Sequence, residues 1–290
     1  MENKKAYYKA LIHVVCCVII ILLFVLTTMR VNAMDQINNL TISTFKPLIN
    51  RNVKQVRNTK YDKPRIIENN IYVTLEKYSN TINFFRELFG FPEEFVKEDL
   101  IKRNITATEF SEKNIGGLTK NNELISFSNV EQGISEYFFE IAELYPEKRD
   151  NKFLGYTGDS EYIEKLIIYY TNIYQDVDTT LALSIGAAES GYYKVKYMLQ
   201  KNNVYGGMGK NGLIVYDNIE IGVLKYIRLL YNNYFKKGLT TKETIGRKYC
   251  PQYNENGEKV ASAHWINLVS KAETKYKNYI NNIKIEDIIN

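Results

Sequence analysis

Residues Asp178 to Gly191 read DTTLALSIGAAESG, and this stretch decides the fold of the chain. The helix is expected to start at Asp178, and Gly191 suits the position just past its end, where a left-handed backbone is often required. The residues between them are apolar on nearly every side. We therefore predict a helix that is buried at the centre of a helical domain.

Helical periodicity continues on both sides of this central stretch. Before it, the apolar residues of 160–174 fall on one stripe, with Asp159 or Ser160 as the N-cap. After it, the Gly-rich segment 202–216 carries only a short strand signal, at 213–216. The chain thus turns from helix to loop and back to helix.

Three further helices are predicted after this segment. The first opens with the capping box Asp217-x-x-Glu220. The second opens with Thr240-x-x-Glu243. The last should turn these side chains inward: Trp265, Leu268, Val269, Ala272, Tyr276 and Ile280. The whole pattern predicts a mainly α fold with a small β and loop lobe.

Residues 114–137 repeat the pattern of residues 203–226. One inserted residue aligns the Gly-Gly, Lys-Asn, Leu-Ile, Asn-x-Glu-x-Gly and final Tyr positions. Because loop and helix cap match together, we predict a helical accessory module over 71–150, a degenerate duplicate of the C-terminal module at 151–285. Glu109 lies too close to the Gly-Gly pair to rebuild a cleft helix and loop, so we assign no catalysis to the accessory module.

Composition excludes several classes of protein. The chain has 290 residues, 45% of them hydrophobic, and a formal net charge of +5, which excludes a disordered chain and a polybasic nucleic-acid tail. Cys16 and Cys17 lie in an apolar run, so Cys250 has no partner and a disulfide framework is excluded. Only two histidines are present, which excludes a His-rich metal site. We expect no metal, no cofactor and no nucleic-acid partner.

The N-terminal region predicts a membrane anchor. Residues 10–29 carry no formal charge, and about twenty such residues cross a hydrocarbon core of about 30 Å. Three lysines lie within the first nine residues, so the positive-inside rule places residues 1–9 in the cytoplasm and the rest outside. A cleaved signal peptide is the alternative, because 31–33 resembles a cleavage site. We favour an uncleaved anchor followed by a polar stalk at 30–70: a single-pass protein of the cell membrane with an extracellular C-terminal domain.

Glu189 lies at the end of the central helix. Desolvation and the negative end of the helix dipole both raise the pKa of a carboxyl group placed there, as a general acid requires. The alternative is an exposed side chain at a fraying helix end. Four motifs follow Glu189 in order: Asn202-Asn-Val-Tyr-Gly-Gly, Tyr216-Asp-Asn-Ile-Glu, Tyr249-Cys-Pro and His264-Trp-Ile-Asn.

Over residues 155–285, this series resembles the bacterial glucosaminidase family of peptidoglycan hydrolases, which includes autolysins and belongs to the lysozyme superfamily. In that family an Ala-x-x-Glu-Ser-Gly helix end precedes Asn-Asn-(Phe/Tyr)-Gly and a Tyr-(Asp/Glu)-Ser helix start. The resemblance implies a lysozyme-like fold for the C-terminal module. It also implies that Glu189 is the catalytic general acid.

The resemblance implies further site residues. Tyr249 falls near the cleft tyrosine of the family and is a second catalytic candidate. That match is loose, because the family continues Ala-Thr-Asp-Pro where this chain has Cys-Pro, and a packed tyrosine is the alternative. Aromatic rings beside amides suit sugars. The substrate-binding candidates are Asn202, Asn203, Tyr205, Gly206, Tyr216 and Tyr192. We expect Tyr197 and Tyr226 to fill the core instead.

A second carboxylate, which glycosidases normally use, is missing from the expected place. Three lysines and no acid lie between Glu189 and Asn202. Asp217, Glu220 and Glu243 are better explained as caps or cap partners, and Glu255 and Glu258 stay open. A single acid fits cleavage assisted by the substrate's N-acetyl group, or a lytic transglycosylase.

The sequence therefore predicts a membrane-anchored, exported endo-β-N-acetylglucosaminidase that cleaves the β-1,4 backbone of peptidoglycan glycan strands. One alternative is a lytic transglycosylase that acts on the same glycan. Another is a cleavage-dead protein that binds the cell wall or serves as a scaffold. The accessory module would extend the glycan groove or hold a membrane or wall-associated protein partner.

Overall fold

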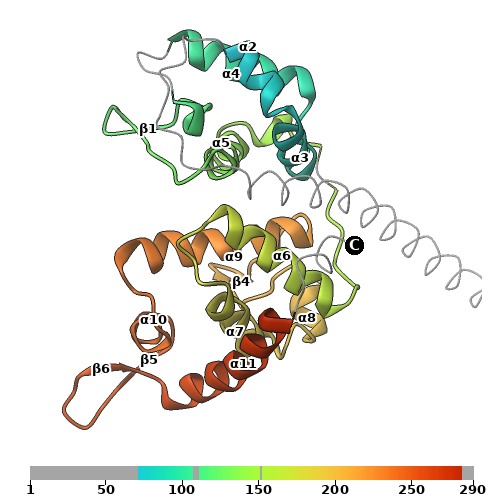
Figure 1. The fold of residues 1–290 in the computed structure, drawn as a ribbon. Coiled ribbons are helices and arrows are strands. Elements are labelled where there is room, and N and C mark those ends of the chain that lie inside the picture. Colours follow the sequence, from blue (N-terminus) through green and yellow to red (C-terminus); the bar gives the residue numbers. More distant parts are fainter. Residues whose placement is uncertain (1–70, 107–110, 151, 283–290) are drawn as a thin grey trace, which may run out of the picture. The chain divides into compact units, whose positions relative to one another are not determined.

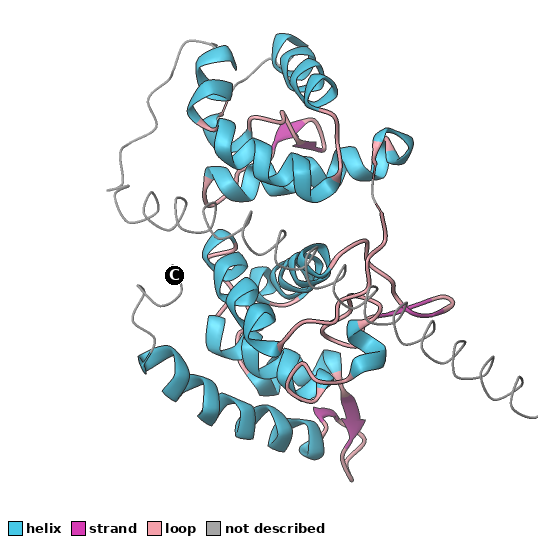
Figure 2. Cartoon of the chain, turned by 90° about the vertical axis from the view of Figure 1, so that its right-hand side faces the viewer, coloured by secondary structure: helices cyan, strands magenta, loops and turns pink. Residues whose placement is uncertain are grey.

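The computed structural model describes residues 71–106, 111–150 and 152–282. These residues are mainly helical, with three two-stranded antiparallel hairpins (Figures 1 and 2), which confirms the prediction of a mainly α fold. The predicted cytoplasmic tail, membrane anchor and stalk lie outside the described residues. Within the described ranges, no helix has the length and apolar character needed to span a membrane.

The C-terminal module is built around α7 (Thr179–Ser190), which is buried on most sides as predicted. The side chain of Asp178 accepts a hydrogen bond from the Leu181 backbone N–H, and Gly191 ends the helix in a left-handed conformation. The predicted start of the helix and the predicted glycine at its end are both confirmed, with Asp178 as the N-cap. The other elements are α6 (Ser160–Ile173), α8 (Lys196–Leu199), β3 (Met208–Gly209), β4 (Gly212–Leu213), α9 (Ile219–Asn233), η3 (Phe235–Lys237), α10 (Lys242–Tyr249), β5 (Pro251–Tyr253), β6 (Lys259–Ala261) and α11 (Ala263–Asn282).

Two helix starts differ from prediction. The N-cap of α9 is Asn218, whose side chain accepts from the Ile221 N–H at 2.8 Å, and not Asp217. Asp217 instead forms an ion pair with Arg149. At α10 the capping box is made by Thr241 and Thr244 rather than by the predicted pair one residue earlier. In both helices the observed cap lies one residue later than predicted.

The long helix α11 packs along α7 (Figure 1). Its side chains at Trp265, Val269, Ala272 and Tyr276 are buried as predicted. The prediction for Leu268 is wrong, since this side chain is 36% exposed. It lies beside the buried stripe, one residue before Val269, and the contact with α7 is narrower than the apolar pattern suggested.

The accessory module consists of short helices and one hairpin around a cluster of phenylalanine rings. Phe89 and Phe138 stack with centroids 5.8 Å apart, and Phe85 also stacks with Phe138, at 6.0 Å. Its elements are α2 (Ile71–Lys77), α3 (Ser79–Phe89), α4 (Glu93–Thr106), η1 (Glu112–Asn114), β1 (Thr119–Lys120), β2 (Glu123–Leu124), α5 (Val130–Leu144) and η2 (Pro146–Lys148).

The two copies of the sequence repeat have the same local architecture. The side-chain amide of Asn114 donates to carbonyl oxygens on both sides of the β1–β2 hairpin, and that of Asn203 does the same at the β3–β4 hairpin. Asn129 caps α5 as Asn218 caps α9. A buried asparagine that closes a hairpin, followed by an asparagine cap, therefore defines each copy.

The two modules contact each other reciprocally. Asn129 donates its side-chain amide to the carbonyl of Ile173 at the end of α6, at 2.9 Å. Asn218 donates in the same way to the carbonyl of Leu88, near the end of α3, at 3.3 Å. Each cap thus satisfies a carbonyl near a helix C-terminus in the other module. Glu136 and Arg228 add an ion pair with three hydrogen bonds across the same contact.

Candidate functional site

Glu189 lies in the last turn of α7 and is half-buried. Its Oε1 accepts a hydrogen bond from the indole Nε1–H of Trp265 at 2.7 Å. Its Oε2 faces the glycine loop (residues 202–207), because a Cβ built on Gly206 would lie 3.6 Å from it. The carboxyl group therefore sits between the start of α11 and the glycine loop.

The electrostatic environment of Glu189 favours its neutral form. Burial raises the pKa of the carboxyl group, and the hydrogen bond from Trp265 offsets part of this rise. Burial, and then the charge of Glu189, raise the pKa of the hydroxyls of Tyr226 and Tyr249, which stay neutral. A half-buried carboxyl group with a raised pKa among neutral groups can donate a proton near neutral pH.

Tyr249 lies beside the acid without a hydrogen bond to it. Its ring stacks on Trp265 with centroids 5.6 Å apart and planes at 29°. Its hydroxyl donates to the backbone carbonyl of Tyr205 at 3.0 Å. Tyr249 therefore links α10 to the glycine loop while supporting the indole that contacts Glu189.

The two asparagines of the glycine loop are fully buried. Asn202 accepts from the backbone N–H of Tyr156 and donates to the carbonyls of Leu154 and Tyr216. Asn203 closes the β3–β4 hairpin and accepts from the N–H of Gly207. These amides are engaged with backbone groups, so both residues shape the loop that faces Glu189.

The tyrosine candidates occupy different environments. Tyr205 and Tyr216 are buried, and their hydroxyls are hydrogen-bonded to each other. Tyr192 is half-buried and has a positive φ of 59°. The ammonium of Lys275 lies 5.1 Å from the centre of its ring. Of the three rings, that of Tyr192 is the most accessible.

The two tyrosines expected in the core differ from each other. Tyr226 is fully buried and its hydroxyl donates to the carbonyl of Ala182, which confirms the prediction. Tyr197 is 60% exposed, so the prediction for it is wrong. It lies on α8, a helix of one turn whose inward contacts are made by Met198 and Leu199 instead.

The remaining candidate acids either have other partners or are exposed, as Glu243 and Glu255 are. Asp217 pairs with Arg149. Glu220 is 4% exposed and accepts from the Tyr162 hydroxyl at 2.6 Å. Glu258 is exposed on the β5–β6 hairpin. None of these three carboxylates contacts Glu189 in the described structure.

Replacement of Glu220 by glutamine tests how burial of this carboxyl group affects stability. Burial raises the pKa of Glu220, so the folded-state pKa exceeds the unfolded one. The contribution of Glu220 to stability is therefore fully present below its unfolded pKa of about 4.3 and is lost as pH rises through the folded pKa. The amide still accepts from Tyr162, so Glu220→Gln should flatten this dependence and be at least as stable at neutral pH. Urea denaturation across this pH range measures the effect. A variant less stable than wild type at neutral pH would contradict this prediction.

Trp265 is the site residue that the sequence did not identify as one. The apolar pattern placed it in the core through its position on the last helix, and it is indeed buried. Its hydrogen bond joins residues 76 positions apart. A lone tryptophan directly after the single histidine of the last motif is the signal that could have drawn attention to it.

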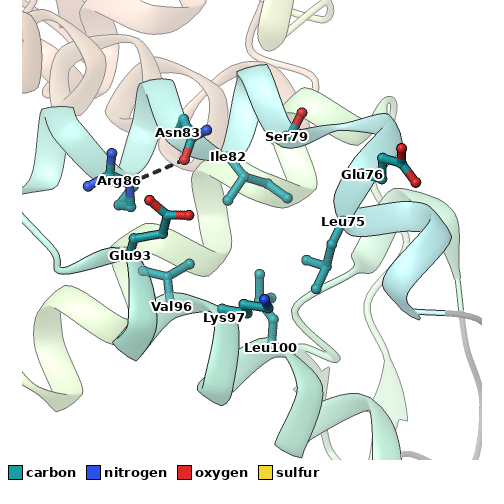
Figure 3. A pocket seen from close by; sticks show the side chains of 10 residues that line it. All are labelled: Leu75, Glu76, Ser79, Ile82, Asn83, Arg86, Glu93, Val96, Lys97 and Leu100. Atoms are coloured by element: carbon teal, nitrogen blue, oxygen red, sulfur yellow. Dashed lines mark hydrogen bonds between the residues drawn. The ribbon is translucent and has the colours of Figure 1, made fainter.

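The accessory module holds a pocket of about 280 Å³ between α2, α3 and α4 (Figure 3). Leu75, Ile82, Val96 and Leu100 form its apolar part. Four charged side chains also line it, two acidic and two basic: Glu76, Glu93, Arg86 and Lys97. This pocket belongs to a different module from Glu189. In the described parts of both modules, no group of three or more His, Cys, Asp or Glu side chains could hold a metal ion.

No protein-family model, curated protein or solved structure matches this chain. The arrangement around Glu189 and the sequence motifs are therefore the basis on which function is argued below.

Proposed function

We propose that the chain is an exported glycoside hydrolase that cleaves the β-1,4 backbone of peptidoglycan, with Glu189 as the general acid. The observation that carries this proposal is the position of Glu189. It is a half-buried carboxyl group with one oxygen held by Trp265 and the other facing a glycine loop. A protonated carboxyl group in this position can deliver its proton to the leaving glycosidic oxygen.

The chemistry needs a nucleophile as well as an acid. Because Asp217 and Glu220 have other partners and the other candidate acids (Glu243, Glu255 and Glu258) are exposed, we propose that the N-acetyl group of the substrate attacks the anomeric carbon while Glu189 protonates the leaving oxygen. Water then opens the cyclic intermediate and leaves a new reducing end. In a lytic transglycosylase, a hydroxyl group of the sugar closes the ring instead and leaves an anhydro end.

The accessory module supports binding in this proposal and takes no part in the chemistry. Arg103 lies in the last turns of α4. Its Cβ lies 3.9 Å from the position that a Cβ would take on Gly117, in the Gly-Gly turn of the same module. Its guanidinium pairs with Asp99 and Glu140. A cation thus stands beside the glycines of this module, whereas the C-terminal module has an acid there.

We further propose that residues 10–29 anchor the protein in the cell membrane with both modules outside.

Mass spectrometry of muropeptides released by the protein tests the proposal. New reducing ends on N-acetylglucosamine are expected. Anhydro ends would identify a lytic transglycosylase. Binding to sacculi without released products would identify a cleavage-dead wall-binding protein. A glycan whose cleaved sugar lacks the N-acetyl group should resist hydrolysis, and its efficient cleavage would contradict substrate assistance.

Replacement of Tyr249 by phenylalanine should destabilise the protein by about 1–3 kcal/mol, because the carbonyl of Tyr205 loses its donor. The ring can still stack on Trp265, so the acid keeps its support. Turnover should therefore fall much less than in Glu189→Gln. Thermal denaturation and product release measure the two effects. A loss of turnover with unchanged stability would assign the hydroxyl a direct role with the substrate.

A further inference from the structure

We propose that Trp265 is a positioning residue that determines which oxygen of Glu189 carries the transferable proton. The indole N–H donates to Oε1 at 2.7 Å, while Oε2 faces the glycine loop. An oxygen that accepts a hydrogen bond is the carbonyl-type oxygen of a neutral carboxyl group, so the proton resides on the other oxygen. Trp265 thereby directs the O–H of Glu189 toward the loop. The catalytic part of this inference rests on the proposed function, whereas the contact itself does not.

The position of the indole is fixed by its surroundings. It is 5% exposed, and the Tyr249 ring stacks on it. Gly246 of α10 leaves room for it, because a Cβ at that position would lie 2.9 Å from the indole Cζ3. A side chain packed so closely cannot rotate toward another acceptor. This fixed orientation is what a positioning residue requires.

The groups that face this contact are uncharged. Tyr226 of α9 and Tyr249 of α10 keep neutral hydroxyls, since burial raises the pKa of both. Tyr205 of the glycine loop is likewise neutral, because burial raises its pKa too. His264 precedes Trp265 in the chain and is exposed in the first turn of α11. The Glu189–Trp265 bond is therefore the charge-dependent contact expected to dominate at the indole.

The chain contains a single tryptophan, so the intrinsic tryptophan emission of the full-length protein comes from Trp265 alone. Emission should follow one ionisation with the pKa of Glu189 and should lose that transition in Glu189→Gln. His264→Gln and Glu243→Gln are the controls, and both should retain it. A transition that survives in Glu189→Gln, or that disappears in His264→Gln, would contradict a hydrogen bond between Glu189 and Trp265 as the cause of the emission change. The readout needs no substrate, so it stands or falls independently of glycan cleavage.

The catalytic consequence is tested by removing only the N–H. Because there is one tryptophan, biosynthetic replacement by benzothienylalanine, in which sulfur replaces the N–H, alters Trp265 alone. Without the donor, the pKa of Glu189 should rise, and the high-pH limb of the turnover profile should move upward by about one to two pH units. Trp265→Phe should move the limb in the same direction.

The two substitutions separate positioning from packing. Turnover should fall about tenfold or more in the isostere, which fills the same space, while the substrate KM changes little. An unchanged pH profile and unchanged turnover in the isostere would reduce Trp265 to a packing residue. If the protein cleaves no glycan at all, the proposed function fails while the emission titration still reports the contact.

Discussion

Replacement of Glu189 by glutamine should lower glycan turnover by at least about 10²–10⁴-fold, the usual contribution of general acid–base catalysis. Glutamine is close to glutamate in size and can still accept the indole N–H of Trp265 through its amide oxygen. What it removes is the acidic proton on the side that faces the glycine loop. Glycan binding should therefore survive the change while turnover is lost.

The matched control is Glu243→Gln, because Glu243 is exposed in the first turn of α10. Its turnover should stay within a few fold of wild type. Thermal denaturation of both variants shows whether either effect comes from folding. Glu189→Gln should not be less stable, because burial raises the pKa of Glu189 and the neutral amide avoids the cost of a buried charge. A loss of only a few fold in turnover would remove Glu189 from the chemistry.

The features that the sequence predicted correctly are set by short-range rules. The central helix was bounded by Asp178 and Gly191, because an N-cap side chain bonds three residues ahead and a helix-ending glycine needs only its own backbone freedom. The same rules place Glu189 at the end of this helix, whereas its catalytic role stays a prediction. Its raised pKa then followed from burial.

The features that the sequence did not predict depend on partners far along the chain. Asp217 was expected to cap α9, but Arg149 binds it from 68 residues away and Asn218 takes the cap. Likewise, the contact between Trp265 and Glu189 joins two helices that are distant in sequence. Periodicity shows that a side chain turns inward, but it does not show which polar atom meets which.

The sequence repeat shows both short-range rules and contacts between distant residues. Its alignment rested on loop glycines and on the Asn-x-Glu-x-Gly cap, and the structure shows a separate physical reason for the last glycine in each copy. Gly222 of α9 lies directly against the backbone of Asn202, and Gly133 of α5 lies in the same way against Lys113. In each copy the helix thus crosses the start of the hairpin segment so closely that no side chain fits at the glycine position.

Replacement of Gly222 by alanine should destabilise the protein by at least about 3 kcal/mol, beyond the ordinary cost of overpacking. Glycine to alanine within a helix normally stabilises by about 1 kcal/mol, so the expected sign is reversed. The reason is geometric: the new Cβ would lie 1.8 Å from the carbonyl oxygen of Asn202, which has no room to move because its own side chain is held by three hydrogen bonds.

Two further variants make this prediction specific. Gly133→Ala should be destabilised to a similar degree, since its Cβ would lie 1.8 Å from the carbonyl oxygen of Lys113 in the accessory module. Asn232→Ala is the control on α9, half-buried near the helix end, and should change stability by no more than about 0.5 kcal/mol. Urea denaturation of the three variants measures the differences. If Gly222→Ala is as stable as wild type, helix and loop are not in contact at this position, and the glycine loop that faces Glu189 is held by other means.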